Sequence, residues 1–209
     1  MRASHLRIAL LVLWIAFFCW YTSFGGPLDA AEIEEFVARM EQNGMDPERI
    51  TLWRGFMESD TGDDFAVVNL IDFKDEPDRI EGIGPDETTE EVMARYTQPF
   101  FKQMMPRATH PVVLGSAAHR AIDIWGIEGA EDWTAFGMVR YRSRRDLMEV
   151  ASSGSDDASI HDFKIAAIEK TIAFPIDPWF QLGDPRLVLA GLFGMVALAL
   201  PRGRAKNRA

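Results

Sequence analysis

The sequence predicts an α+β fold, with a four-stranded sheet that carries helices on one face and an apolar helix at each end of the chain. Residues Trp133 to Pro175 have the pattern strand, helix, helix, strand, and residues Phe65 to Trp125 have the pattern strand, helix, strand. Together they give the split βαβ order, which is typical of ferredoxin-like sheets. The third observation is an uncharged apolar run near each terminus.

In the second half of the chain, Thr134 to Arg142 alternates in a way that makes both faces largely apolar, which predicts a central strand. Ser143 stands three residues before Asp146, so a helix should start directly after this strand. A second helix is expected around Ile160 to Ile168, and a short strand from Thr171 to Ile176.

In the first half, two helices should begin at Asp29 and at Asp46, each capped by its aspartate. Phe65 to Phe73 is the clearest strand. A capping box formed by Thr88 and Glu91 predicts the next helix, which Pro99 should kink or break. The stretch Val112 to Trp125 is mixed in pattern and fits one strand or a bent pair of strands.

The first apolar run, Ile8 to Phe24, would span roughly 26 Å as a helix, which is near the lower limit for crossing a bilayer. A cleavable secretory signal is the alternative, with Ala30 or Ala31 near the end of a cleavage region. The run is long for a signal and lacks an A-x-A site. We therefore expect an uncleaved anchor over residues 1–26, and under both interpretations the residues after the run are exported.

The second apolar run, Leu187 to Leu200, would span only about 21 Å, a length that also fits a buried core helix. It has no polar stripe, however, and the cationic sequence RGRAKNR comes directly after it. These features favour a membrane helix over 184–201 and a basic cytoplasmic tail over 202–209. Cations at both outer ends then predict an integral membrane protein with both termini in the cytoplasm. We expect the membrane to be a bacterial inner membrane. A helical linker over 27–60 and a ferredoxin-like domain over 61–178 would be periplasmic or otherwise extracytoplasmic.

The charge distribution argues against nucleic-acid binding. The chain of 209 residues has a net charge of −10, and all its acidic residues lie between Asp29 and Asp184. Such a surface repels phosphate backbones. The only cysteine, Cys19, lies inside an apolar run, and no two histidines stand at metal-ligand spacing, so we expect no disulfide, metal or other cofactor.

Several segments together resemble the uncharacterised bacterial family catalogued as domain of unknown function 1330. They are VVNLIDFK (67–74), the helix with Arg95, Tyr96 and Pro99, WTAFGMVRYRSRRDLMEVASS (133–153) and IHDFKIAAIEKT (160–171). The resemblance covers roughly residues 60 to 176 and implies membership of the dimeric α/β-barrel superfamily, whose ferredoxin-like domains pair through their sheets. Members of that superfamily differ in function, so the resemblance implies no particular chemistry. The sequence departs from the family pattern at Arg142, where relatives usually have proline, and at Pro106 to Pro111, which replaces a glycine pair.

Three residues are candidate ligand contacts, and no catalytic residue can be assigned. Arg140 lies on an apolar strand face, where a cation needs an anionic ligand or a carboxylate, and an ion pair with Glu169 or Asp123 is the favoured explanation. Asn69 is polar in an apolar strand face and fits a core or dimer contact as well as a substrate contact. His161, at a helix start, is a general base, a ligand contact or a solvated surface residue.

These observations leave three hypotheses. The preferred one is a membrane-anchored, outward-facing binding or interaction domain, with a homodimer formed through the sheet and a small-molecule ligand as expected partners. The alternative is a cofactor-free monooxygenase-like or isomerase-like enzyme for a small anionic or apolar substrate. That enzyme requires Arg140 to meet His161 or Asp123 within about 3 Å of one point in a pocket. The third is a structural partner of other membrane proteins, using the apolar helices and the glycines Gly191 and Gly194.

Overall fold

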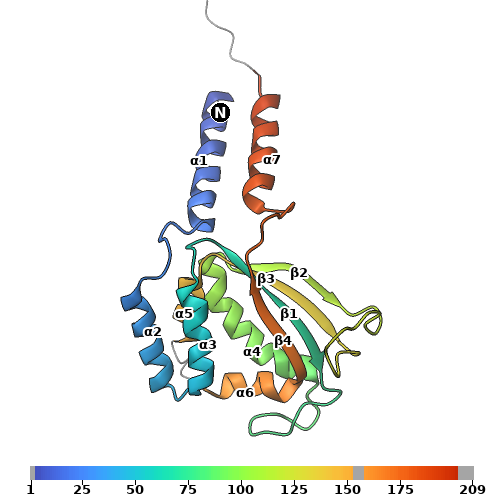
Figure 1. The fold of residues 1–209 in the computed structure, drawn as a ribbon. Helices are drawn as coiled ribbons and strands as arrows, with labels where there is room; N and C mark the ends of the chain where they lie inside the picture. The colour runs from blue at the N-terminus through green and yellow to red at the C-terminus, as the bar shows by residue number, and fades with distance from the viewer. Residues whose placement is uncertain (1–2, 153–157, 202–209) are drawn as a thin grey trace, which may run out of the picture. The chain divides into compact units, whose positions relative to one another are not determined.

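The computed structural model describes residues 3–152 and 158–201. The chain divides into two compact units, one of which contains Phe24–Asp177 and the other Met1–Ser23 with Pro178–Ala209. The first unit has a mixed α+β architecture (Figure 1). The basic tail expected at 202–209 lies outside the described residues.

The Phe24–Asp177 unit is built on a four-stranded antiparallel sheet. The strands are β1 (Phe65–Phe73), β2 (His110–Ser116), β3 (Ala135–Tyr141) and β4 (Ile168–Ile176), in the order β2-β3-β1-β4. Helix α4 (Thr89–Met104) and the 3₁₀ turn η1 (Met105–Arg107) connect β1 to β2. Helices α5 (Arg144–Ala151) and α6 (Ala158–Ala167) connect β3 to β4. Strand β3 therefore lies between β1 and β2, as the split βαβ order predicts.

The main core lies between one face of this sheet and the helices. Phe65 and Tyr141 are paired across β1 and β3, so their rings extend to the same face, where they stack with centroids 5.1 Å apart. They pack with Val139 against Met104 of α4 and Leu147 of α5. A second cluster around Val92 of α4 joins that helix to α6. The helices α3 to α6 consequently lie on one side of the sheet (Figure 1).

Two helices precede the sheet, namely α2 (Ala30–Gln42) and α3 (Pro47–Glu58). Asp29 and Glu32 form a capping box at the start of α2, and Asp46 caps α3, as predicted from the sequence. The apolar sides of both helices pack with Met148 of α5 in one cluster. Residues 27–60, which we expected to be a helical linker, are thus part of the same compact unit as the sheet.

One local expectation differs from the structure, and for another the structure excludes one of two alternatives, a break at Pro99. The stretch Val112 to Trp125 is not a long strand or a bent pair, because β2 starts at His110 and ends at Ser116, and no strand is found between 117 and 134. Its mixed pattern arises partly from an irregularity between Pro111 and Val113, which shifts the alternation by one residue. Pro99 lies inside α4, which continues through it to Met104.

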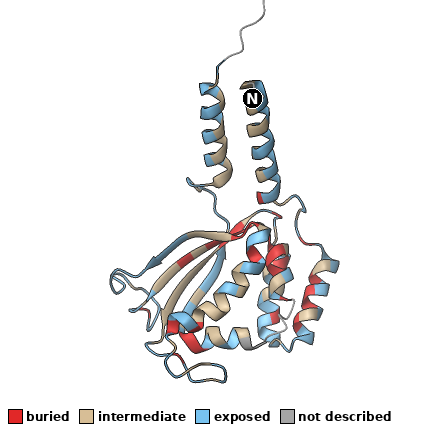
Figure 2. Cartoon of the chain, turned by 180° about the vertical axis from the view of Figure 1, so that it is seen from behind, coloured by how far each residue is buried: buried red, intermediate tan, exposed pale blue. Residues whose placement is uncertain are grey.

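The other unit contains two apolar helices, α1 (Ala3–Tyr21) and α7 (Pro185–Ala199). They lie side by side and antiparallel, since Arg7 reaches Ala197 near the end of α7, and Trp14 reaches Arg186 near its start. Tyr21 is the only buried residue among the described residues of the two helices (Figure 2). Within the described chain, α1 alone is long and apolar enough to cross a membrane, and α7 is a shorter apolar helix.

Candidate functional site

The face of the sheet that points away from the helices carries a row of apolar side chains. Val139 and Tyr141 point toward the helices, so Met138, the residue before Val139, points the other way. The register places Val68 and Val113 beside Met138, and Phe174 beside Val68. We call this surface the uncovered face. Its apolar residues are Val68, Leu70, Val113, Phe136, Met138, Ile172 and Phe174.

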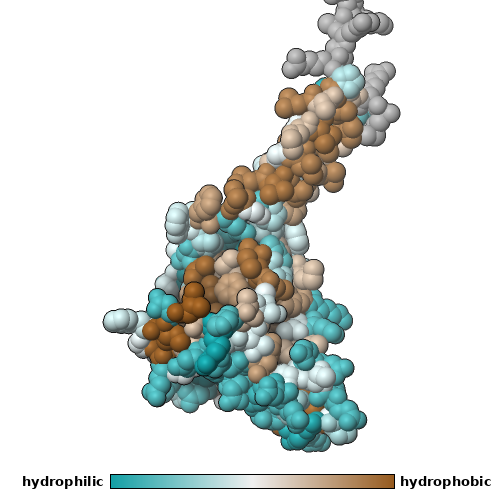
Figure 3. All heavy atoms as spheres, turned by 90° about the vertical axis from the view of Figure 1, so that its right-hand side faces the viewer, coloured by the Kyte–Doolittle hydropathy of each residue, from teal (hydrophilic) through white to brown (hydrophobic). Residues whose placement is uncertain are grey.

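Within the Phe24–Asp177 unit, none of the described helices packs over this face (Figure 1). Val113 and Phe174 are 46% and 45% exposed, and the other apolar residues of the face are partly exposed. Figure 3 shows apolar side chains gathered in the middle of this side of the unit, with hydrophilic residues around them. A contiguous apolar surface with a polar rim is typical of a binding or association site.

Charged pairs lie at the two ends of the uncovered face. At one end the Arg140 guanidinium donates two hydrogen bonds to Asp64 Oδ2, from Nε at 3.0 Å and from Nη2 at 2.8 Å. At the other end Lys170 Nζ lies 3.6 Å from Asp72 Oδ2. The charges at both ends are therefore already paired within the chain, and the middle of the face is left apolar.

The partner expected for Arg140 was wrong, because neither Glu169 nor Asp123 lies near it. Glu169 is at the start of β4, and Asp123 is in the loop before β3, so both lie toward the opposite end of the sheet. Arg140 is opposite Ala66 in the register, which brings it next to Asp64, just before β1. With 1% of its side chain exposed, Arg140 also donates to the Ala108 carbonyl at 3.0 Å. These contacts support a structural ion pair.

Asn69 is on the helix-facing side of β1, opposite Gly137. Its side-chain amide donates to the Val67 carbonyl at 3.2 Å and to the Gly137 carbonyl at 3.4 Å. Both acceptors belong to the sheet itself. The structure thus gives Asn69 partners within the sheet and places it on the face opposite Met138.

His161 is exposed on α6, beside Tyr96 of α4, with the two rings edge to face and their centroids 6.3 Å apart. Lys164, one turn further along α6, places its ammonium 5.3 Å from the centre of the Tyr96 ring. Partial loss of hydration lowers the pKa of His161, and the charges of Lys164 and Arg49 lower it further, while Asp162 acts in the opposite direction. Sequence reasoning missed Tyr96, Lys164 and Arg49, although the i, i+3 spacing of His161 and Lys164 was a usable signal.

The structure does not bring Arg140 and His161 together. Arg140 projects from β3 on the side away from the helices, whereas His161 belongs to a helix on the other side of the sheet. The enzyme hypothesis required Arg140 to meet His161 or Asp123 at one point in a pocket, and Asp123 lies toward the opposite end of the sheet. That arrangement is not formed, so the geometry gives this version of the enzyme no support.

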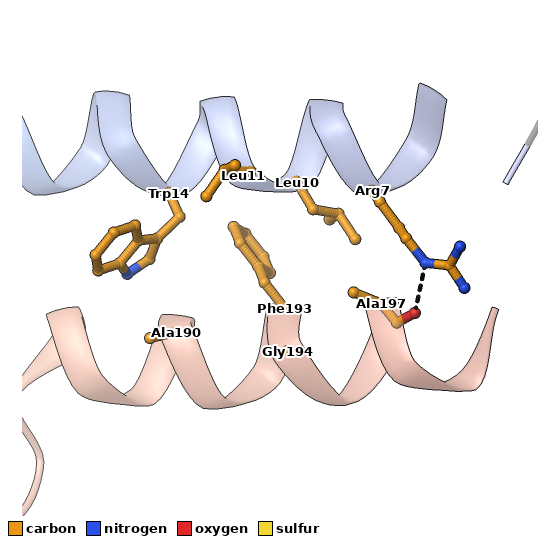
Figure 4. A pocket seen from close by; sticks show the side chains of 8 residues that line it. All are labelled: Arg7, Leu10, Leu11, Trp14, Ala190, Phe193, Gly194 and Ala197. Atoms are coloured by element: carbon orange, nitrogen blue, oxygen red, sulfur yellow. Dashed lines mark hydrogen bonds between the residues drawn. The ribbon is translucent and has the colours of Figure 1, made fainter. Parts of the chain in front are cut away.

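Two further concavities lie elsewhere in the described chain. A polar recess is lined mainly by charged groups. In the described chain, no group of three or more histidine, cysteine, aspartate or glutamate residues is placed to hold a metal ion. The recess is lined by Asp72, Phe73, Lys74, Asp75, Glu76, Asp78, Thr134 and Glu169. A groove of about 240 Å³ between α1 and α7 is mostly apolar and is lined by Leu10, Leu11, Trp14 and Phe193 among others (Figure 4). At its end Arg7 donates to the carbonyls of Ala197 and Leu200.

Comparison with known proteins shows no family. No family model matches the sequence, and no curated protein matches it. Among solved structures, RPA0582, a protein of unknown function from Rhodopseudomonas palustris, is 19% identical, with a TM-score of 0.44 over 65% of this chain and 95% of that one. The methylated form of RPA0582 gives 16% identity and a TM-score of 0.45 over 66% and 95%. The protein At3g17210 from Arabidopsis thaliana gives 17% identity and a TM-score of 0.34 over 56% and 97%.

Proposed function

We propose that this chain is a membrane-anchored protein whose Phe24–Asp177 unit is a ferredoxin-like interaction module that pairs with a second copy through the uncovered face. The observation that carries the proposal is the apolar row across β2, β3, β1 and β4, which no described helix of the unit covers. Removing such a surface from water stabilises association in proportion to the apolar area buried. The resemblance to domains that pair through their sheets agrees with this choice of partner.

A second copy fits this face because its chemistry is self-complementary. The apolar residues are central, and the charges at both ends have partners within their own chain. A symmetric pair therefore needs no unpaired charge in the interface. A stable interface buries about 800 Å² on each partner, which is a realistic area for one face of a four-stranded sheet.

The pairing is tested by sedimentation of the full chain in detergent. We expect the wild type to sediment as a dimer and Phe174→Glu to sediment as a monomer, since the substitution places a charge in the apolar row of the interface. Leu52→Glu is the matched control, because Leu52 is 75% exposed on α3, outside the uncovered face. A monomeric wild type, or a Phe174→Glu variant that remains dimeric, would refute the pairing.

The membrane part of the proposal rests on α1, which is long and apolar enough to span a bilayer, and on the antiparallel contact of α7 with it. We propose that both helices lie in a bacterial inner membrane, with the Phe24–Asp177 unit on the periplasmic side. Single cysteines test this topology, because Cys19 is the only native one. In a Cys19→Ser background, an impermeant maleimide should label Ser116→Cys in intact spheroplasts, and should label Ser4→Cys only after lysis.

Two results would contradict the anchor and its orientation. If alkaline carbonate extracts the wild-type chain from membranes, it is not integrally anchored. If Ser4→Cys reacts in intact spheroplasts and Ser116→Cys does not, the orientation is the reverse of the one proposed.

A further inference from the structure

The helix-covered side of the Phe24–Asp177 unit contains a group of basic side chains that the sheet-pairing function does not use. Lys164 and His161 are one turn apart on α6, and both lie against the Tyr96 ring of α4. Arg49, from α3, is close enough for its charge to act on both. Two basic groups thus lie against one aromatic ring, and a third acts on both, in a chain with a net charge of −10.

Lys164 is the unusual member of this group. Its side chain is partly buried, and its ammonium faces the Tyr96 ring at 5.3 Å. Among the described residues, no carboxylate forms an ion pair with Lys164 or with Arg49, and no acceptor receives a hydrogen bond from either side chain. By contrast, the buried cation Arg140 holds a carboxylate at 2.8 Å. A cation that is moved out of water loses solvation free energy unless an anion compensates for it. The described residues supply no such anion to Lys164, so its partial burial is uncompensated.

The charged groups around His161 contribute to its lowered pKa. Lys164 and Arg49 oppose its protonation, and Asp162 on the same helix favours it. Burial and Arg49 likewise lower the pKa of Lys164. A bound anion would relieve all of these repulsions at once, because it would offset the charge that each basic group places on its neighbours.

We propose that Lys164 and His161, beside the Tyr96 ring, form a binding site for a doubly charged oxyanion such as a sulfate or phosphate group. The Lys164 ammonium is the central contact. The His161 imidazolium supplies further charge and hydrogen-bond donors from the exposed side, and the charge of Arg49, from α3, adds to the positive potential. This site lies on the side of the sheet opposite the uncovered face, so it does not depend on the proposed pairing.

Sulfate is the first probe, since it keeps both charges throughout the histidine titration. The full chain in detergent micelles, labelled with ¹³C at histidine Cε1, is titrated with sulfate and, at equal ionic strength, with chloride. The His161→Gln spectrum assigns the His161 resonance among the four histidines. We expect sulfate, and not chloride, to shift this resonance and to raise the pKa of His161. Affinity should increase as the pH falls through that pKa, because the protonated imidazole adds a positive charge.

Matched variants locate the central contact. Lys164→Gln should weaken sulfate binding about tenfold, since it removes a charge-assisted hydrogen bond from a partly buried position. Lys102→Gln, at an exposed lysine of α4, should change the affinity less than about twofold. The site is refuted if sulfate does not shift the wild-type His161 resonance, or if folded Lys164→Gln binds sulfate as well as the wild type does.

A comparison of inorganic phosphate with phenyl phosphate identifies the source of the anion. Tighter binding of phenyl phosphate would indicate an aromatic ester that contacts the Tyr96 ring, and equal affinities would indicate the free ion. Failure of both to bind would overturn the site and leave the sheet-pairing proposal intact.

Discussion

Arg140 and Asp64 show how much a single buried charge can depend on one partner. The guanidinium is 1% exposed, and Asp64 accepts two of its hydrogen bonds. Removal of the carboxylate leaves the buried charge without this compensation, whereas replacement of the cation by an apolar side chain removes the charge itself. The two halves of the pair should therefore not be equivalent in a mutational test.

We predict that Asp64→Ala lowers the free energy of unfolding by about 3 kcal/mol and that Arg140→Met lowers it by less. Urea unfolding followed by tryptophan fluorescence measures both changes. Asp132→Ala is the control, because its ion pair with Arg120 is 59% and 65% exposed and should contribute less than about 1 kcal/mol. If Asp64→Ala costs no more than this control, Arg140 does not need the carboxylate.

The carboxylate of Glu32 gives the unit a defined sensitivity to acid. Two hydrogen bonds from Arg145, at 2.6 and 2.9 Å, and one from the Asp29 backbone N–H, at 3.0 Å, lower the pKa of Glu32 from 4.5 to about 2. Because the folded-state pKa is depressed, the stabilisation is present above the unfolded pKa. It should be lost as the pH falls from 4.5 toward 2.

We expect Glu32→Gln to be less stable than the wild type near neutral pH and the difference to shrink between pH 4.5 and 2. Urea unfolding at several pH values gives this difference directly. Glu41→Gln, at an exposed position of the same helix, is the control for loss of a carboxylate and should change the free energy of unfolding little. A Glu32→Gln difference that stays constant down to pH 2 would show that the Arg145 contact is not made in solution.

At the scale of the elements, one glycine joins the chain before α2 to the turn before β1. Gly62 has a φ of 83°, and a Cβ at this position would lie 2.5 Å from the Gly26 carbonyl carbon. Asp60 fixes the same contact, since its carboxylate accepts hydrogen bonds from the N–H groups of Leu28 and Gly62, at 2.9 and 3.0 Å. The two backbone segments are therefore too close for any side chain at position 62.

Gly44 provides a matched comparison for Gly62. Its φ is 72°, and no atom lies within 4 Å of a Cβ built there. Gly44→Ala should cost only the left-handed strain, about 1–2 kcal/mol, and Gly62→Ala should cost clearly more because backbone atoms must also move. Thermal or urea unfolding distinguishes the two variants. Equal losses would mean that the contact between Gly62 and Gly26 is loose.

The sequence predicted the elements better than it predicted their contacts. Capping residues such as Asp29 and Thr88, together with the alternation in Phe65–Phe73, act locally, so these helix starts and this strand were predicted correctly. The end of β2 was not, because an irregularity between Pro111 and Val113 changes the alternation. Whether α2 and α3 pack on the sheet unit is decided by long-range contacts that no local pattern contains.

The candidate site was likewise predicted where local patterns determine it and missed where long-range contacts do. The sequence of β3 shows apolar residues on both faces of the strand. In the structure one of these faces packs against the helices, and the other belongs to the uncovered face. The partner of Arg140 depends on the register of β1 against β3, which the sequence does not state, so Asp64 was missed. Lys164 was missed because its burial depends on how α6 packs against α4.

At the scale of the whole molecule, α1 and α7 should contribute unequally to membrane attachment. The apolar length of α1 is sufficient to span a bilayer, whereas α7 has 15 residues. We predict that a chain truncated after Asp177 remains in the membrane fraction after carbonate extraction, and that a chain lacking residues 1–23 does not. Retention of the second variant would show that α7 anchors the chain by itself.

The pairing of the two terminal helices also sets an order of events during synthesis. Helix α1 leaves the ribosome first, but its partner α7 emerges only after the whole Phe24–Asp177 unit has been made. At about 5–20 residues per second, roughly ten to thirty seconds separate the two helices. During that interval the groove-lining side of α1, including Arg7 and Trp14, has no α7 to contact. Any delay in the synthesis of the Phe24–Asp177 unit prolongs the time that this side of α1 spends without its partner helix.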